Sequence, residues 1–221
     1  MKRSPTKKSE VTRDNILQCA LRLFNEHGVG AVNTHDIAKA AGLSPGNLYY
    51  HFKNKKEIIR SIFEQIPMFS TESWKQALAD DNPKGFHVFV DFYFLQLTQY
   101  RFLFHEQMML MREDKILADK WRMAHTRLRH VMRGAVAVWI KRGIMKEFSS
   151  PEGIDAFIDN GWIILNFAHV YFETGSKDGV AVSDELLNRQ MIAFLRPYHT
   201  AAGMRTLDKY LQEHRLKQRD C

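Results

Sequence analysis

The feature that most constrains the fold of this chain is a pair of short helical segments joined by a turn of only two residues. Residues 34–41 carry apolar side chains at helical spacing, Gly42 and Leu43 follow, and residues 44–52 form the second segment. Glycine readily adopts the left-handed backbone conformation that so tight a turn needs. Pro45 suits the first position of a helix, because the N–H group it lacks has no helical partner there. The pattern predicts a short helix set across another.

The two faces of these segments differ in chemistry. Apolar residues are predicted to pack between the two helices: Ile37, Ala38, Ala41 and Leu48. The outer face of the second helix is polar and aromatic: Asn47, Tyr49, Tyr50 and His51. A short helix presented in this way fits the major groove of duplex DNA, which is ~12 Å wide. The segment therefore predicts a helix-turn-helix that binds DNA.

The rest of the chain is also predicted to be helical. Apolar residues recur at helical spacing in windows that begin near residues 12, 54, 83, 101, 115, 151, 184 and 206. Thr12 or Asp14 is expected to cap the first helix and Thr34 the second, while Gly28 and Gly143 are expected to end helices. No convincing strand-like alternation accompanies these windows. The expected fold class is all-α.

Charge is concentrated near the N-terminus. The chain has a net charge of +7 and a pI of about 9.4, and residues 1–66 alone carry +5. Such a balance favours a polyanionic partner, either nucleic acid or an acidic membrane surface. Residues 1–10 are expected to form a flexible basic arm, which either has no function or adds phosphate contacts.

The cysteines and the apolar runs bear on localisation. Cys19 and Cys221 are far apart in sequence, so a disulfide framework is not expected and a reducing cytoplasm fits. The basic start leads into no apolar segment of the kind found in signal peptides, and no window approaches 18 apolar residues. We therefore expect a cytoplasmic protein without a membrane span.

Two stretches resemble the tetracycline-repressor (TetR) family. They are FNEHG at residues 24–28 and THDIAKAAGLSPGNLYYHFKNK at residues 34–55, and the resemblance extends over about residues 11–66. It implies an N-terminal three-helix helix-turn-helix DNA-binding domain in that range. It also implies a larger helical domain over residues 67–221 for effector binding and dimerisation, although this half matches only in size and helical character.

The resemblance also implies roles for individual residues in the N-terminal part. Thr34 and Lys55 would contact phosphate, and the leading edge of the second helix would reach base edges through Asn47. The full set implied to contact DNA is Thr34, His35, Ser44, Pro45, Gly46, Asn47, Tyr49, Tyr50, His51 and Lys55.

For the C-terminal half, the resemblance implies a homodimer in which two helices of each chain form a four-helix bundle. Candidate interface residues are Trp162, Leu165 and Phe194. The aromatic- and methionine-rich middle would hold the effector, with candidate residues Phe89, Phe102, His105, Met109, Trp121 and His125. Such a lining suits a small, largely apolar compound, although side chains in this pattern also form ordinary cores.

The expected function is that of a dimeric transcriptional regulator, a repressor that the effector releases from a near-palindromic operator by tilting the helix at residues 54–66. An activator remains an alternative. An enzyme is disfavoured, because Met109 stands where a zinc hydrolase with His105-Glu106 needs its second histidine. A membrane-surface module is disfavoured because acidic residues interrupt the basic helix faces. No metal or other cofactor is expected.

Overall fold

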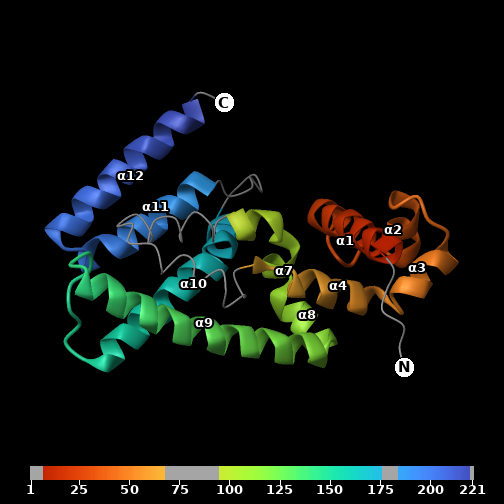
Figure 1. Cartoon of the computed structure of the whole chain (residues 1–221), viewed down its shortest axis with the longest axis horizontal. Helices are drawn as coiled ribbons and strands as arrows, with labels where there is room; N and C mark the ends of the chain where they lie inside the picture. The colour runs from red at the N-terminus through yellow and green to blue at the C-terminus, as the bar shows by residue number, and fades with distance from the viewer. Residues whose placement is uncertain (1–6, 68–94, 176–183, 220–221) are drawn as a thin grey trace. The chain divides into compact units, whose positions relative to one another are not determined.

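A computed structural model describes residues 7–67, 95–175 and 184–219 (Figure 1). These residues form helices joined by short connections and include no β-strand, which confirms the all-α prediction. The helices are α1 (Lys7–His27), α2 (Thr34–Ala40), α3 (Pro45–His51), α4 (Lys55–Glu64), α7 (Arg101–His105), α8 (Gln107–Glu113), α9 (Lys115–Lys141), α10 (Pro151–Gly175), α11 (Asp184–Leu195) and α12 (Ala201–Arg219), with a 3₁₀ turn at Arg196–Tyr198. The window predicted to begin near residue 83 lies largely outside the described residues.

The described residues divide into two compact units. The first contains the residues up to Ile66 together with Gln99–Trp121, and the second contains the remainder. The first unit therefore takes in α7, α8 and the start of α9 in addition to the segment predicted as the DNA-binding domain. Among the described helices, none contains a segment long and apolar enough to cross a lipid bilayer.

Helix α1 begins earlier than its expected caps. It starts at Lys7, so residues 7–10 are helical and are not part of an arm. Thr12 lies within the helix, where its hydroxyl donates to the carbonyl oxygen of Lys8 at 3.0 Å. Gly28 ends the helix with a φ of +77°, as predicted.

The caps of α2 and α3 fix the geometry of the turn between them. The N-cap of α2 is Asn33 and not Thr34, because Asn33 and Asp36 form a reciprocal capping box that Thr34 has no place in. Ser44 caps α3 as predicted, its hydroxyl accepting from the N–H of Asn47 at 3.3 Å. Gly42 has the left-handed conformation expected for the turn, with a φ of +70°.

The core of the first unit joins α1 to the segment after residue 99. Phe24 of α1 packs on Phe102 of α7, with ring centroids 5.0 Å apart. Phe63 of α4 packs on Trp121 at 4.9 Å, and Phe104 meets the same indole edge-on at 5.8 Å. All five rings are buried. The segment 99–121 is therefore an integral part of this core.

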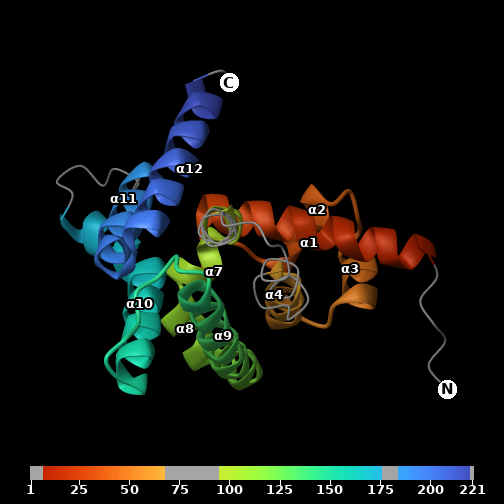
Figure 2. The ribbon, with the colours of Figure 1, turned by 60° about the vertical axis from the view of Figure 1, so that its left-hand side comes forward.

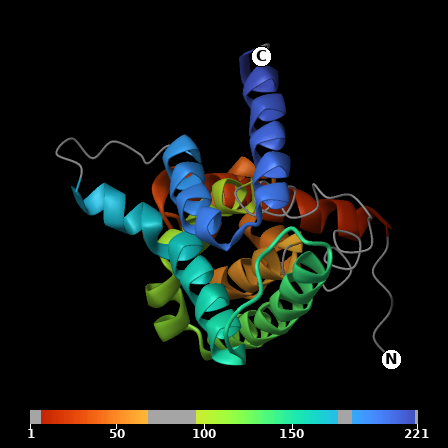
Figure 3. The same cartoon turned by 90° about the vertical axis from the view of Figure 1, so that its left-hand side faces the viewer.

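In the second unit, α10 packs beside α11 (Figure 3). Phe157 and Phe194 stack across this contact with ring centroids 5.2 Å apart. Helix α9 ends at Lys141, and Gly143 follows with a φ of +68°, as predicted. Helix α12 begins at Ala201 and not near residue 206, because the hydroxyl of Thr200 accepts from the N–H of Gly203 and caps it.

Candidate nucleic-acid interface

Helix α3 has a buried side and an exposed side. Leu48 and the C-cap residue Phe52 are 0% and 1% exposed and anchor the helix in the first unit. Tyr49 and Tyr50 are 51% and 80% exposed, and Asn47 is exposed beside them. Figure 2 shows α3 with α2 in the N-terminal part of the chain. Because the two tyrosines are not needed to fill the core, this side can contact a ligand.

The other residues predicted to contact DNA lie at the starts of α2 and α3. The hydroxyls of Thr34 and Tyr49 lie 2.9 Å apart and join the two helices. His35 is exposed on the first turn of α2. The start of α3 is exposed as well, at Ser44, Pro45 and Gly46.

Lys55, which the resemblance assigns to phosphate, is held by the protein itself. Its ammonium donates to the carbonyl oxygens of Val29 and Val32 at 2.6 and 2.7 Å. Lys56 similarly donates to the carbonyl oxygen of Glu113 at 2.6 Å. Lys53, between α3 and α4, has an exposed side chain.

The loop between α1 and α2 is also held from the segment after residue 99. The N–H of Val29 donates to the carboxylate of Glu106 at 2.8 Å. The side chain of Asn25 donates to the carbonyl oxygen of Gln99 at 2.8 Å and accepts from the N–H of Phe102 at 3.0 Å. These bonds fix the end of α1 and the loop that leads to α2.

Arg13 is a residue of this region that sequence reasoning missed. Its guanidinium donates to the carbonyl oxygen of His51, at the end of α3, and to the hydroxyl of Ser61 in α4. The available signal was its place in α1, three residues before the buried Ile16 and four before the buried Leu17. That spacing puts a cation on the buried side of the helix.

His51 has an altered ionisation. Partial burial and the positive charge of Arg13 lower the pKa of its imidazole below the ordinary value of 6.5. Tyr50 packs edge-on against this ring with centroids 5.1 Å apart. Burial and the charge of Arg13 therefore favour the neutral form of the His51 ring in the free protein.

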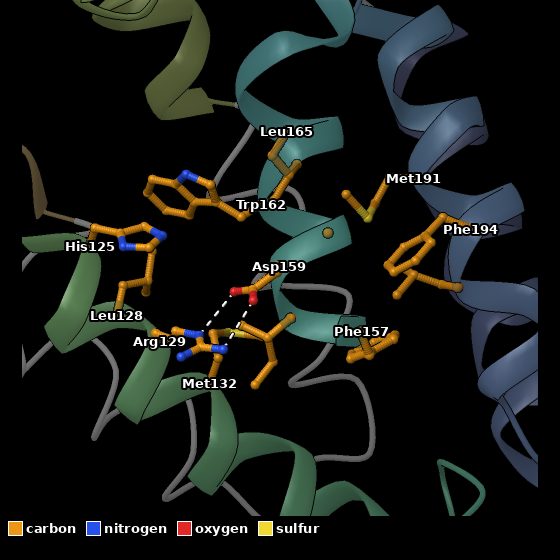
Figure 4. Close-up of a pocket in the computed structure, with 13 residues that line it drawn as sticks. His125, Leu128, Arg129, Met132, Phe157, Asp159, Trp162, Leu165, Met191 and Phe194 are labelled. Atoms are coloured by element: carbon orange, nitrogen blue, oxygen red, sulfur yellow. Dashed lines mark hydrogen bonds and ion pairs between the residues drawn. The ribbon is translucent and has the colours of Figure 1, made fainter. Parts of the chain in front are cut away.

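A cavity of about 50 Å³ lies within the second unit (Figure 4). It is lined from α9, α10 and α11, largely by apolar side chains. His125 and Trp162 meet edge-on at its wall, with ring centroids 4.9 Å apart. Arg129 forms a two-bond ion pair with Asp159 at 2.9 and 3.0 Å, so this charged part of the wall is internally neutralised.

The six residues predicted to line an effector pocket do not gather in this cavity. His125 lines it. Phe102 and Trp121 are buried in the core of the first unit, while His105 and Met109 are exposed in that unit. Phe89 lies outside the described residues. The helical spacing of Phe102 and Trp121 predicts that each lies on an apolar helix face. It does not predict which other residues pack against that face.

The three residues predicted at a dimer interface face the same cavity. Trp162, Leu165 and Phe194 all line it, with Leu165 buried. A different set of large apolar side chains is exposed on α10: Ile163, Phe167, Val170 and Tyr171. Their spacing of four, seven and eight residues from the first places them on one side of the helix.

The described residues contain no cluster of histidine, cysteine and acidic side chains that could hold a metal ion. Two candidate sites stand out in the described part of the chain: the exposed face of α3 and the cavity of the second unit. The exposed face of α3 suits contact with the phosphates and bases of a nucleic acid, and the cavity suits an apolar compound.

Two family models match the chain. One, described as bacterial regulatory proteins of the tetR family, matches residues 16–62. The other, described as a bacterial transcriptional repressor (TetR), matches residues 60–207, which is more than half of the chain.

Curated relatives match the N-terminal part. The chain is 42% identical over 64 residues to the HTH-type transcriptional regulator AcrR of Shigella flexneri, a match that covers 29% of this chain and 30% of the relative. It is 39% identical over 64 residues to QacR of Staphylococcus aureus, covering 29% and 34%. These matches thus span only about a third of the relatives' length.

Solved structures match over most of the chain. A TetR-family transcriptional regulator from Marinobacter aquaeolei VT8 has a TM-score of 0.75 and 27% identity, covering 91% of this chain and 98% of that one. The SmeT–triclosan complex has a TM-score of 0.57 and 22% identity, covering 86% and 93%. The second likeness is one of fold alone.

Proposed function

Because this chain belongs to the TetR family of DNA-binding transcriptional regulators, we propose that it is a homodimeric repressor that a small, largely apolar effector releases from a near-palindromic operator. The observation that carries the proposal is the division of α3 into a buried anchor and an exposed face with two tyrosines and an asparagine. The match to a bacterial transcriptional repressor model supports repression over activation.

In the proposed complex, the exposed face of α3 enters the major groove. Asn47 reads base edges, since its amide both donates and accepts hydrogen bonds. Tyr50 and Lys53, both exposed, contact the sugar-phosphate backbone. Thr34 and Tyr49 lie close enough to share one phosphate. Lys55 serves chiefly to hold the loop before α2.

The proposed dimer forms through the exposed side of α10. Ile163, Phe167, Val170 and Tyr171 make an apolar strip that water surrounds in the single chain. Burying it against the same strip of a second chain is favourable, at roughly 25 cal/mol per Å² of apolar surface. A two-fold dimer would place the α3 helices of its two chains, which act as the recognition helices, ~34–36 Å apart. This spacing favours a near-palindromic site.

The proposed effector site is the cavity of the second unit. Its present volume of about 50 Å³ is well below the roughly 300 Å³ at which ligand pockets of drug-like compounds begin. An effector must therefore displace lining side chains, and the unbranched Met132 and Met191 can adapt at small cost. The relative SmeT, which shares the fold, was solved with triclosan, and this supports a compact apolar compound.

Release would follow from a shift between two conformers that differ in the tilt of α4. To lower operator affinity ~1000-fold, the effector must prefer the non-binding conformer by about 4 kcal/mol. A compound that binds both conformers equally would leave DNA binding unchanged, however tightly it bound.

The proposal is tested by selection from a random pool of duplex DNA with the purified protein. We expect enrichment of a near-palindromic site bound by two chains, with specific affinity at least 1000-fold above that for unrelated duplex. A panel of apolar compounds, scored for release of the selected duplex, then tests the effector. If no duplex is enriched, DNA recognition is contradicted; if compounds bind the cavity without releasing DNA, the regulatory part is contradicted.

A further inference from the structure

Arg13 of α1 bridges two other helices of the first unit. One guanidinium nitrogen, Nη1, donates to the carbonyl oxygen of His51, the last residue of α3, at 3.0 Å. The other, Nη2, donates to the hydroxyl of Ser61 in α4 at 2.8 Å. The guanidinium carbon lies 4.0 Å from the ring centroid of Phe52, the C-cap residue of α3. One side chain thus joins α1, the end of α3 and the middle of α4.

Each of these contacts has a physical reason. The last carbonyl groups of a helix lack intrahelical partners and carry its partial negative charge, so a cation there is favourable. Phe52 is 1% exposed and so cannot move easily, and the planar guanidinium can stack on its ring. Ser61 is 9% exposed, and Arg13 supplies a partner for its hydroxyl.

The orientation of the recognition helix α3 depends on such contacts because the helix is short. It has seven residues, and Leu48 is its only buried residue, followed by the buried Phe52 at its C-cap. Packing of two side chains fixes the depth of a helix better than its direction. A directed bond at its last carbonyl restrains the tilt, and a small tilt would move Asn47 and Tyr50 away from their partners on DNA.

We propose that Arg13 is a positioning residue that sets the orientation of α3 against α1 and α4, and so determines selectivity among DNA sequences without contacting DNA. The inference rests on the proposed function. Base reading requires exact placement of α3, whereas general attraction to phosphate depends mainly on charge. Loss of Arg13 therefore lowers affinity for the selected site more than affinity for unrelated DNA.

The test measures dissociation constants for a duplex selected by the wild-type protein and for an unrelated duplex of equal length, each at several salt concentrations. For Arg13→Ala we expect at least a tenfold loss on the selected duplex, less than about a threefold loss on the unrelated one, and an unchanged salt slope. Arg13→Lys keeps the positive charge but loses the two-pronged guanidinium that bridges His51 and Ser61 and stacks on Phe52. Its selectivity should therefore lie between that of Arg13→Ala and that of the wild type.

The matched control is Arg22→Ala, which removes an equal charge from an exposed position of the same helix. It should leave the ratio of the two affinities unchanged. Ser61→Ala removes only the bond to α4 and should lower the ratio in the same direction as Arg13→Ala, but less. Circular dichroism and thermal unfolding of every variant monitor the fold.

Two results would overturn the inference. The first is an Arg13→Ala protein with wild-type selectivity. The second is an equal loss on both duplexes with a salt slope smaller by about one, since that marks a phosphate contact. If Arg13→Ala does not fold, wild-type selectivity in both Arg13→Lys and Ser61→Ala overturns it. Failure of the wild-type protein to select any duplex contradicts the proposed function instead.

Discussion

The ammonium of Lys55 and the carboxylate of Glu106 hold the backbone of Val29 from its two sides. Lys55 donates to the carbonyl oxygen of Val29 at 2.6 Å, and Glu106 accepts from its N–H at 2.8 Å. One residue of the loop before α2 is thereby fixed by a cation from α4 and an anion from the segment after residue 99. The placement of α2 depends on this pair of contacts.

Replacing Lys55 by alanine is therefore expected to destabilise the fold. The change removes the donor for two carbonyl groups, and hydrogen bonds to charged groups are worth ~1.5–3 kcal/mol each before allowance for solvent screening. Because Lys55 is only partly buried, we expect the free energy of unfolding to fall by about 1–3 kcal/mol in urea titrations. Lys53→Ala serves as the control, with little change in stability and a salt slope for DNA lower by about one. Wild-type stability of Lys55→Ala with a reduced salt slope would assign Lys55 to DNA after all.

Replacing Tyr50 by alanine should, in contrast to Lys55→Ala, lower DNA affinity and leave stability nearly unchanged. Tyr50 is 80% exposed and fills no part of the core, so we expect unfolding within about 0.5 kcal/mol of the wild type. Affinity for the selected duplex should fall at least tenfold. Electrophoretic mobility shifts measure this, with Met123→Ala as a control at a large side chain that is 63% exposed on α9. Unchanged affinity would mean that α3 does not meet DNA through this face.

Much of the region around α3 could be predicted because its determinants are local. Ser44, Pro45 and Gly42 act on their own backbone, and the helical spacing of Leu48 and Phe52 marks the buried side. The partners of Arg13 and Lys55 could not be predicted, since they come from residues 23 to 48 positions away. The predicted effector set failed to converge on the cavity for the same reason: Phe102 and Trp121 lie on apolar helix faces, but those faces cover the first unit.

The dimer contact can be tested with Phe167→Glu. A charge at the centre of the apolar strip on α10 should oppose its burial against a second copy. Analytical ultracentrifugation should show a shift from dimer to monomer, and binding to a near-palindromic duplex should weaken with it. Glu173→Ala, a change on the same helix outside the strip, is the control. A dimer that persists unchanged in Phe167→Glu would place the interface elsewhere.

Replacing two glycines of the second unit by alanine should change the stability of the protein in opposite directions. A Cβ added at Gly203 would collide with the carbonyl oxygen of Ile144, so Gly203→Ala should cost at least the ~1–3 kcal/mol typical of overpacking. Gly134 lies in α9 with no atom near an added Cβ, so Gly134→Ala should stabilise the helix by roughly 0.5–1 kcal/mol. Thermal unfolding measures both, and equal melting temperatures of the two variants would contradict the geometry at Gly203.

Buried His199 should make stability depend on pH. Burial, with a smaller effect of Arg196, lowers the pKa of its imidazole below 6.5. The ring therefore stays neutral in the native protein where the unfolded chain already binds a proton, so stability is full above about pH 6.5 and falls as the pH decreases. We expect a lower melting temperature at about pH 5.5 than at pH 7.5, and a weaker pH dependence in His199→Gln. His130→Gln, an exposed change, should keep the wild-type dependence, and an unaltered dependence in His199→Gln would contradict the assignment.

The return of the chain to the first unit at Gln99 limits how this regulator can be divided. A cut after Ile66 would part Asn25 from Phe102 and Val29 from Glu106, and would uncover the aromatic rings of Phe24 and Phe63. Residues 7–66 therefore do not form a complete folding unit by themselves. A hybrid regulator that borrows residues 7–66 must also carry Gln99–Trp121, or re-create on its own scaffold the contacts that this segment makes through side chains such as Phe102, Phe104, Glu106 and Trp121.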